Sequence, residues 1–201
     1  MPPKPKFKRE EIVEAAMKIV SKKGIDALTA QELRDELNCS ASPIFTVFHS
    51  MKEIQDEVRV SAMKYFEEFV KTETFDMPIF KQIGMKMAMF GLEEPKLYQL
   101  LFMKENRNAV SFDDVFGELG DTAYLCIDAI EKDYGLTTAQ ARRLFENVWI
   151  YTFGVGALCA TKVCHFSEAE LSEMLTTEFQ AMMMLVKSNE SGVGKNFKEM
   201  I

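Results

Sequence analysis

The fold of this 201-residue chain is decided by residues 29–53, which read TAQELRDELNCSASPIFTVFHSMKE. The tetrapeptide TAQE beginning at Thr29 is a capping box, in which the threonine oxygen caps an exposed amide and the glutamate reaches back, so it predicts a helix over residues 30–37. Asn38 suits the left-handed position that ends such a helix, and Ser40 suits the N-cap of another. The stretch therefore predicts two short helices joined by a tight turn.

A further helix is predicted on the N-terminal side of this pair, over residues 8–23. Apolar residues recur there every three to four positions, and Gly24 supplies a natural C-cap. The helix after Ser40 is predicted over residues 41–48, with Ile44 and Phe48 on its buried side. Three helices this close together, the last two tightly joined, make a helix-turn-helix.

The rest of the chain also has helical patterns, since proline is absent after position 95 and runs of β-branched residues with alternating polarity are missing. Further helices are predicted over residues 51–71, 78–91, 95–103, 111–133, 138–163 and 168–187. We therefore expect an all-α protein with an N-terminal three-helix helix-turn-helix domain at 1–52, a helical domain at 53–188 and a flexible tail at 189–201.

Composition indicates a globular protein, with 47% hydrophobic and 27% charged residues. The sequence has neither an apolar N-terminal signal segment nor the roughly 18 uninterrupted apolar residues of a membrane span, so we expect a cytoplasmic protein that does not enter a membrane. Residues 1–52 hold nine basic and seven acidic residues and so carry a net charge of +2. Because the whole chain carries −7, the remaining residues carry −9. Contact with DNA is therefore expected in the N-terminal quarter.

Residues 7–54 resemble the DNA-binding domain of the TetR family of bacterial transcriptional regulators. The threonine that starts the family's second helix, its tight turn, its aromatic pair and its lysine-glutamate correspond to Thr29, Asn38-Cys39-Ser40, Phe45 with Phe48, and Lys52-Glu53. The resemblance implies a repressor that binds a palindromic DNA operator as a homodimer and is released by a small effector. It makes 1–52 the DNA-binding domain and 53–188 the helical ligand-binding and dimerisation domain. Pro43 and Phe45 depart from the family pattern, and each removes a polar contact with a DNA phosphate.

The predicted recognition helix contains no arginine or lysine, so it cannot form the bidentate contact with guanine that is the commonest specific contact. The methyl groups of Thr46 and Val47 can instead meet thymine methyls in the major groove. Phosphate contacts would come from polar residues around the motif and from the basic arm at 4–9. The candidate DNA-binding residues are Thr29, Gln31, Ser40, Ala41, Ser42, Phe45, Thr46, Val47, His49 and Lys52.

Methionine and phenylalanine gather in the middle of the chain. Methionine repacks readily, which suits a pocket for an apolar or aromatic effector, although helical spacing alone would equally give an ordinary core. The candidate ligand-binding residues are Phe66, Met87, Phe90, Phe102, Met103, Phe112, Phe116, Tyr124, Trp149 and Phe153.

The predicted helix over residues 138–163 is apolar on two faces, so it should be buried both in its own core and against a partner. Within it, residues 149–156, WIYTFGVG, are similar to a motif in the penultimate helix of one C-terminal subgroup of the TetR family. Together with the helix over 168–187 it is the expected dimer surface; a plain monomeric core is the alternative. The candidate dimerisation residues are Val148, Thr152, Val155, Cys159, Leu175, Phe179 and Met182.

Signatures of catalysis are thin, because His49 and His165 are the only histidines and no metalloprotease, P-loop or dinucleotide motif occurs. We expect neither an enzyme nor a cofactor. Cys164 and His165 with Cys159 lack a fourth zinc ligand, and Cys39 is a candidate redox sensor or a buried turn thiol. Two other functions stay open: a small-molecule carrier, and a protein adaptor that uses the helix-turn-helix. A steep fall of duplex affinity with salt would separate a DNA reader from both.

Overall fold

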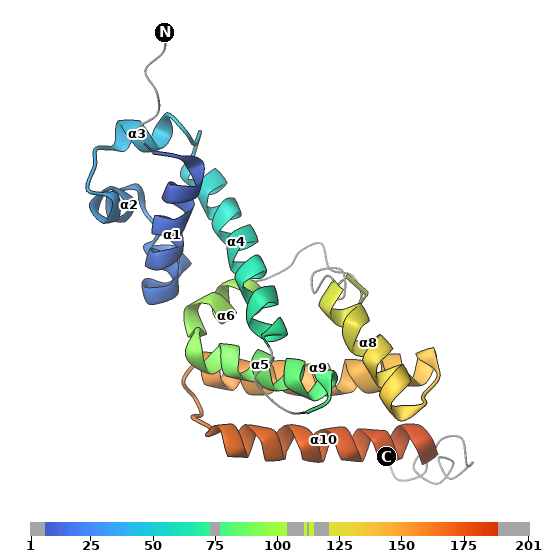
Figure 1. Ribbon diagram of the computed structural model, residues 1–201. Helices are drawn as coiled ribbons and strands as arrows, with labels where there is room; N and C mark the ends of the chain where they lie inside the picture. Colours follow the sequence, from blue (N-terminus) through green and yellow to red (C-terminus); the bar gives the residue numbers. More distant parts are fainter. Residues whose placement is uncertain (1–6, 73–76, 104–110, 112, 115–120, 189–201) are drawn as a thin grey trace.

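The computed structural model describes residues 7–72, 77–103, 111, 113–114 and 121–188, and every regular element in these ranges is helical (Figure 1). The expected all-α fold is confirmed. The predicted tail at 189–201 lies outside the described residues. Within the described ranges, no helix is both long and apolar enough to cross a membrane.

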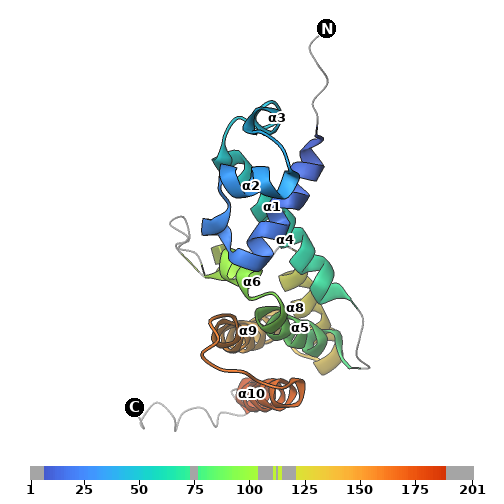
Figure 2. The same cartoon turned by 90° about the vertical axis from the view of Figure 1, so that its left-hand side faces the viewer.

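The helices form two groups connected by one long helix. The N-terminal group consists of α1 (Arg9–Lys23), the 3-10 turn η1 (Ile25–Ala27), α2 (Ala30–Leu37) and α3 (Ala41–Phe45). The connecting helix is α4 (Met51–Lys71), and the C-terminal group consists of α5 (Ile79–Glu93), α6 (Pro95–Phe102), α8 (Asp121–Tyr134), α9 (Thr138–Ala160) and α10 (Glu168–Ser188). Figures 1 and 2 show α5, α9 and α10 side by side, at the far end of the molecule from α3.

Caps set the boundaries of the helices around the predicted turn. The hydroxyl oxygen of Thr29 accepts a hydrogen bond from the Glu32 amide at 3.2 Å, and Asn38 adopts the left-handed conformation with φ 47°. Two cap predictions are corrected. The Glu32 carboxylate does not reach back to the helix start but binds the Lys23 ammonium at 2.5 Å, and Ser40 stands at the N-cap of α3 without a side-chain capping bond.

The recognition helix α3 ends at Phe45, three residues earlier than predicted. The Thr46 hydroxyl donates to the Ser42 carbonyl at 2.8 Å, and the amides of Val47 and Phe48 both donate to the Ile44 carbonyl at 3.0 Å. β-Branched side chains lose rotamer freedom against the preceding helical turn, so Thr46 and Val47 favour this tighter turn over continued helix. The turn also lets Phe48 enter the core, where its side chain is fully buried.

Other boundaries differ less. The helix predicted to reach Val163 ends at Ala160, because Lys162 takes a left-handed conformation with φ 59°. Of the helix predicted over 111–133, the structure describes α8 from Asp121, and most of the preceding residues lie outside the described ranges.

A buried stripe along α4 joins the two groups into one core. Its members recur every four residues: Ile54, Val58, Ala62, Phe66 and Val70. Beyond this covalent link, the two groups also touch directly, because α6 packs on α1.

Candidate functional site

Helix α3 and the turn after it present an uncharged surface. Ile44 and Phe48 are fully buried, whereas Ser42, Phe45 and Thr46 are exposed. Ala41 and Val47 are half-buried, so Val47 offers less surface to a groove than its neighbours. The arrangement leaves small hydroxyl and methyl groups and one aromatic ring to meet a partner.

The candidate phosphate-binding residues around α3 already have partners within the chain. The Gln31 amide donates to the Asp35 carboxylate at 3.0 Å, and the exposed Lys52 ammonium pairs with Asp56 at 3.1 Å. The His49 backbone amide donates to the Glu53 carboxylate at 2.7 Å, while its imidazole is exposed. Ion pairs as exposed as Lys52–Asp56 contribute little, so a phosphate can replace the aspartate. The first part of the basic arm, residues 4–6, lies outside the described residues.

Arg9 holds the turn after α3 against α4. Its guanidinium binds the carboxylates of Glu53 at 2.9 Å and Glu57 at 2.7 Å and lies over the Phe48 ring, 4.2 Å from its centroid. The hydrogen bond from the His49 amide and the bond from Arg9 lower the pKa of Glu53. One side chain thus joins the start of α1, the start of α4 and the turn after α3.

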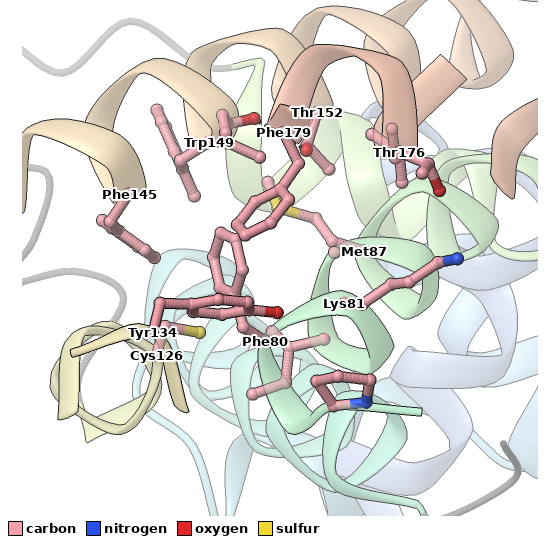
Figure 3. Close-up of a pocket in the computed structure, with 15 residues that line it drawn as sticks. Phe80, Lys81, Met87, Cys126, Tyr134, Phe145, Trp149, Thr152, Thr176 and Phe179 are labelled. Atoms are coloured by element: carbon pink, nitrogen blue, oxygen red, sulfur yellow. Dashed lines mark hydrogen bonds between the residues drawn. The ribbon is translucent and has the colours of Figure 1, made fainter. Parts of the chain in front are cut away.

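An apolar cavity of about 80 Å³ lies among α5, α8, α9 and α10 (Figure 3). Its apolar lining includes Phe80, Ile83, Met87, Cys126, Phe145, Val148, Trp149, Leu175 and Phe179. Gly84 of α5 also faces it, and a methyl group built there would come no closer than 4.0 Å to Leu175. The cavity is smaller than the roughly 150 Å³ of an engineered cavity that binds benzene, so all but the smallest guests must widen it.

Few polar groups line this cavity. The hydroxyls of Thr152 and Thr176 donate to carbonyls of their own helices, at 2.8 and 2.6 Å, and so turn only acceptor oxygens and methyl groups toward a guest. Burial raises the pKa of Cys126 to about 12 and raises that of Tyr134, which keeps both groups neutral. Among the described lining residues, Lys81 is the only charged one. The chemistry of the cavity favours an apolar or aromatic guest.

One side of the C-terminal half of α9 packs closely against α5 and α6. The Tyr98 hydroxyl of α6 donates to the Phe153 carbonyl at 2.9 Å, and the Gln99 side-chain amide donates to the Ala160 carbonyl at 2.6 Å. At Gly91 of α5, a β-carbon would lie 2.4 Å from the Gly156 carbonyl oxygen. Only glycine allows the two backbones to approach so closely.

Solved structures with this arrangement share one fold. A transcriptional regulator of the TetR/AcrR type from Aquifex aeolicus has a TM-score of 0.59 and 17% identity, over 86% of this chain and 98% of its own. A TetR-family protein described as a transcriptional regulator, from Vibrio parahaemolyticus, has a TM-score of 0.58 and 15% identity, over 87% and 98%. The chain has the TetR fold. A TetR variant from Acinetobacter baumannii, solved in complex with minocycline, has a TM-score of 0.52 and 16% identity, over 92% and 98%. No family model and no curated protein matches the sequence.

Within this TetR fold, Met87 and Trp149 line the cavity, and they are the only ones to do so among the predicted ligand-binding residues that the structure describes. Three others form an aromatic cluster between α4, α5 and α6, in which the Phe66 ring lies 5.2 Å from that of Phe90 and 4.9 Å from that of Phe102. These three assignments are corrected to core packing, as is Phe153, which stacks on Trp149 without lining the cavity. Met103 and Tyr124 are exposed; Phe112 and Phe116 lie outside the described residues.

The sequence reasoning missed the aromatic residues that enclose the cavity. The Phe80 ring lies 6.2 Å from that of Phe145 and 5.7 Å from that of Phe179, and Tyr134 lies 5.1 Å from Phe179. Phe145 and Phe179 lie on apolar stripes of their predicted helices, and that pattern marked them as buried without showing that the space between them stays open.

The predicted dimerisation residues point into the TetR fold itself. Val148, Thr152, Val155, Cys159 and Leu175 are buried within the single chain, and Phe179 and Met182 pack against its core. The assignment of the five buried residues to a partner surface is corrected to core packing, whereas Phe179 and Met182 are half-buried and their assignment stays a prediction. The second apolar face expected on α9, at Phe145, Trp149, Phe153 and Ala160, also packs against the chain's own core. The exposed apolar side chains of α9 lie elsewhere, at Ile150 with 54% and Leu158 with 39% exposure.

Proposed function

We propose that this chain is a ligand-responsive transcriptional repressor, which binds a palindromic operator as a dimer and is released by a small apolar or aromatic effector. One observation carries the proposal: a single TetR fold contains both a helix-turn-helix with exposed small side chains and, at the opposite end, an apolar cavity. In this proposal, residues 1–52 bind DNA, and residues 53–188 bind the effector and form the dimer. Catalysis has no part in it.

The dimer surface of this proposal is the exposed face of α9 and α10. Four large apolar side chains lie there in water, at Ile150, Leu158, Met184 and Leu185. Gly154 lies on the same face of α9 with open space around it, which allows a partner helix to come close. Apolar groups gathered on one surface are typical of protein contacts.

The dimer is tested by Ile150→Asp, which would place an unpaired charge in the interface. We expect dissociation at micromolar concentration, because desolvating such a charge costs several kcal/mol. Val60→Asp is the matched control, since Val60 is an exposed valine on α4, far from this face. Light scattering that shows Ile150→Asp still dimeric would exclude the surface.

We propose that effector binding reaches the DNA-facing end through α6 as well as α4. Trp149 and Thr152 line the cavity, and one turn further along α9 the Phe153 carbonyl binds Tyr98 of α6. Helix α6 packs on α1. A route through α4 alone is less direct, because Tyr65, Phe66 and Phe69 all contact the Phe90 ring rather than the cavity.

A salt titration of duplex binding tests the regulator against the carrier and the adaptor. Release of counterions makes the affinity of a DNA reader fall steeply with salt, whereas the other two functions predict no such fall. Lys52→Ala should weaken binding to all duplexes alike and reduce the salt slope by about one. Asp56→Asn should strengthen binding to all duplexes, because it frees the Lys52 ammonium and removes a charge that repels phosphate. Affinities unchanged in both variants would exclude this phosphate contact.

Effector binding can be followed in the same protein through Trp149, the only tryptophan, which lines the cavity. An apolar aromatic probe should change its fluorescence and, with operator present, reduce DNA affinity about 5- to 150-fold. Probe binding without any effect on DNA would favour the carrier.

A further inference from the structure

We propose that the exposed surface of α3 and the turn after it reads thymine methyl groups, so that each operator half-site carries thymines at the steps that this surface contacts. The inference rests on the proposed function. It names the base chemistry that the DNA-facing end recognises and the two side chains, Phe45 and Thr46, that determine it.

The first step is the inventory of side chains from Cys39 to Phe48. None is charged, and none carries an amide. In the major groove, guanine is read by the paired donors of arginine or lysine, and adenine by the donor and acceptor of asparagine or glutamine. This surface has neither, so the usual bidentate contacts with both purines are excluded. The distinctive groups that remain on base edges are the cytosine amino group and the thymine methyl, and only the methyl is apolar.

The second step concerns the hydroxyl group of Thr46, an exposed residue directly after α3. Its hydroxyl hydrogen is used inside the chain, because it donates to the Ser42 carbonyl at 2.8 Å. That bond fixes the side chain and leaves no hydrogen for a base acceptor such as guanine O6 or N7. What Thr46 retains for DNA is a methyl group and an acceptor oxygen.

The third step is the exposure of Phe45. The neighbouring apolar side chains Ile44 and Phe48 are fully buried, whereas 40% of Phe45 remains in contact with water. A ring left exposed beside the Thr46 methyl gains free energy by covering apolar surface on a partner. Thymine methyls are the apolar groups on the floor of the major groove.

The test begins with the full-length protein and a random pool of duplexes, from which tight binders are selected. Selected half-sites should share thymines at fixed positions. Each such duplex is then remade with deoxyuridine in place of one symmetric pair of thymines, which removes only the methyl groups. We expect about four-fold weaker binding per methyl and about fifteen-fold per symmetric pair. Deoxyuridine at flanking thymines is the control and should change little.

A double-mutant cycle assigns the contact to individual methyl groups. Thr46→Ser removes only the protein methyl and keeps the hydroxyl, so discrimination between thymine and deoxyuridine should fall toward one at a single symmetric pair. Phe45→Ala should do the same at a neighbouring pair. Circular dichroism and thermal melting of both variants should match the parent protein, because both side chains are exposed.

The outcomes are distinguishable. If no duplex is selected or bound at any salt concentration, the proposed function fails and this inference fails with it. If duplexes are bound tightly but deoxyuridine substitutes for thymine without loss, or if the fixed positions are guanines, the thymine inference is overturned while the proposed regulator stands. If discrimination persists unchanged in both Thr46→Ser and Phe45→Ala, the assignment to these residues is wrong.

Discussion

The two halves of α9 pack in opposite ways against the same neighbour, α5. Toward its C-terminus, Gly156 approaches Gly91 so closely that a β-carbon does not fit, and α6 binds the helix at two carbonyls. Toward its N-terminus, Phe145, Val148 and Trp149 stand around a cavity. Close packing resists any change of volume, whereas a cavity lined by aromatic residues accepts one. A single helix thereby combines a part that adapts to a guest with a part that holds its position.

Substitutions at two glycines of α5, Gly91 and Gly84, distinguish the two ends of α9 most directly. Gly91→Ala should destabilise the chain by about 1–3 kcal/mol, or more, because the added methyl meets backbone atoms of α9 that cannot rotate away. The melting temperature should drop by several degrees, at roughly 2–4 °C per kcal/mol for a chain of this size. A Gly91→Ala variant that melts at or above the parent temperature would show that the close packing does not exist.

Tyr98→Phe should loosen the closely packed end more mildly. The variant loses the hydrogen bond to the Phe153 carbonyl, which contributes about 1 kcal/mol. It should also weaken the effect of an effector on DNA binding while both separate affinities are kept. Tyr124→Phe is the control, since Tyr124 is mostly exposed on α8. Equal coupling in the Tyr98 variant and the parent would remove α6 from the route.

Gly84→Ala should have the opposite sign to Gly91→Ala. The added methyl has room, and alanine is favoured over glycine inside a helix by about 0.5–1 kcal/mol. Because Gly84 faces the cavity, the same methyl should weaken binding of an aromatic probe measured by Trp149 fluorescence. The substitution would thus raise the free energy of unfolding and lower the affinity for the probe. A variant that binds the probe as tightly as the parent would place the guest elsewhere.

The smallest expected effect concerns the thiol in the cavity wall. With a pKa of about 12, Cys126 is protonated at pH 8 and only about 10⁻⁴ of it is thiolate, so alkylation should be slow and should accelerate as the pH rises toward 12. Cys164, half-buried beyond α9, is the internal comparison. Mass spectrometry of peptides after iodoacetamide treatment measures both. If Cys126 reacts as fast as Cys164 at pH 8, the cavity opens freely to water.

The sequence predicts the helix-turn-helix far better than the cavity, and the reason is local chemistry. Thr29 and Asn38 fix helix ends through their own side chains and backbone preferences, so α2 runs over the predicted residues. The early end of α3 depends on a tighter turn at Val47, whose amide donates to the Ile44 carbonyl only three residues back.

The cavity and the partner surface depend on contacts between distant helices. Val155 and Ile150 are both apolar, and the pattern of one chain does not tell which of the two faces its own core. Phe80 and Phe179 are separated by most of the C-terminal part of the chain, and the space between them follows from how four helices meet rather than from any spacing along one. That is why Phe66 and Phe90 were predicted as ligand contacts and prove to be packing.

The contact between Gly91 and Gly156 also has a mechanical meaning: it is a fulcrum. Val148 stands eight residues before Gly156 and Ala160 four residues after it, which at 1.5 Å per residue gives arms of about 12 Å and about 6 Å. A guest that pushes Val148 outward by about 1 Å tilts a rigid helix by about 5° and moves Ala160 by about 0.5 Å in the opposite direction. The Gln99 side chain, hydrogen-bonded to that carbonyl, then receives half the displacement with twice the force.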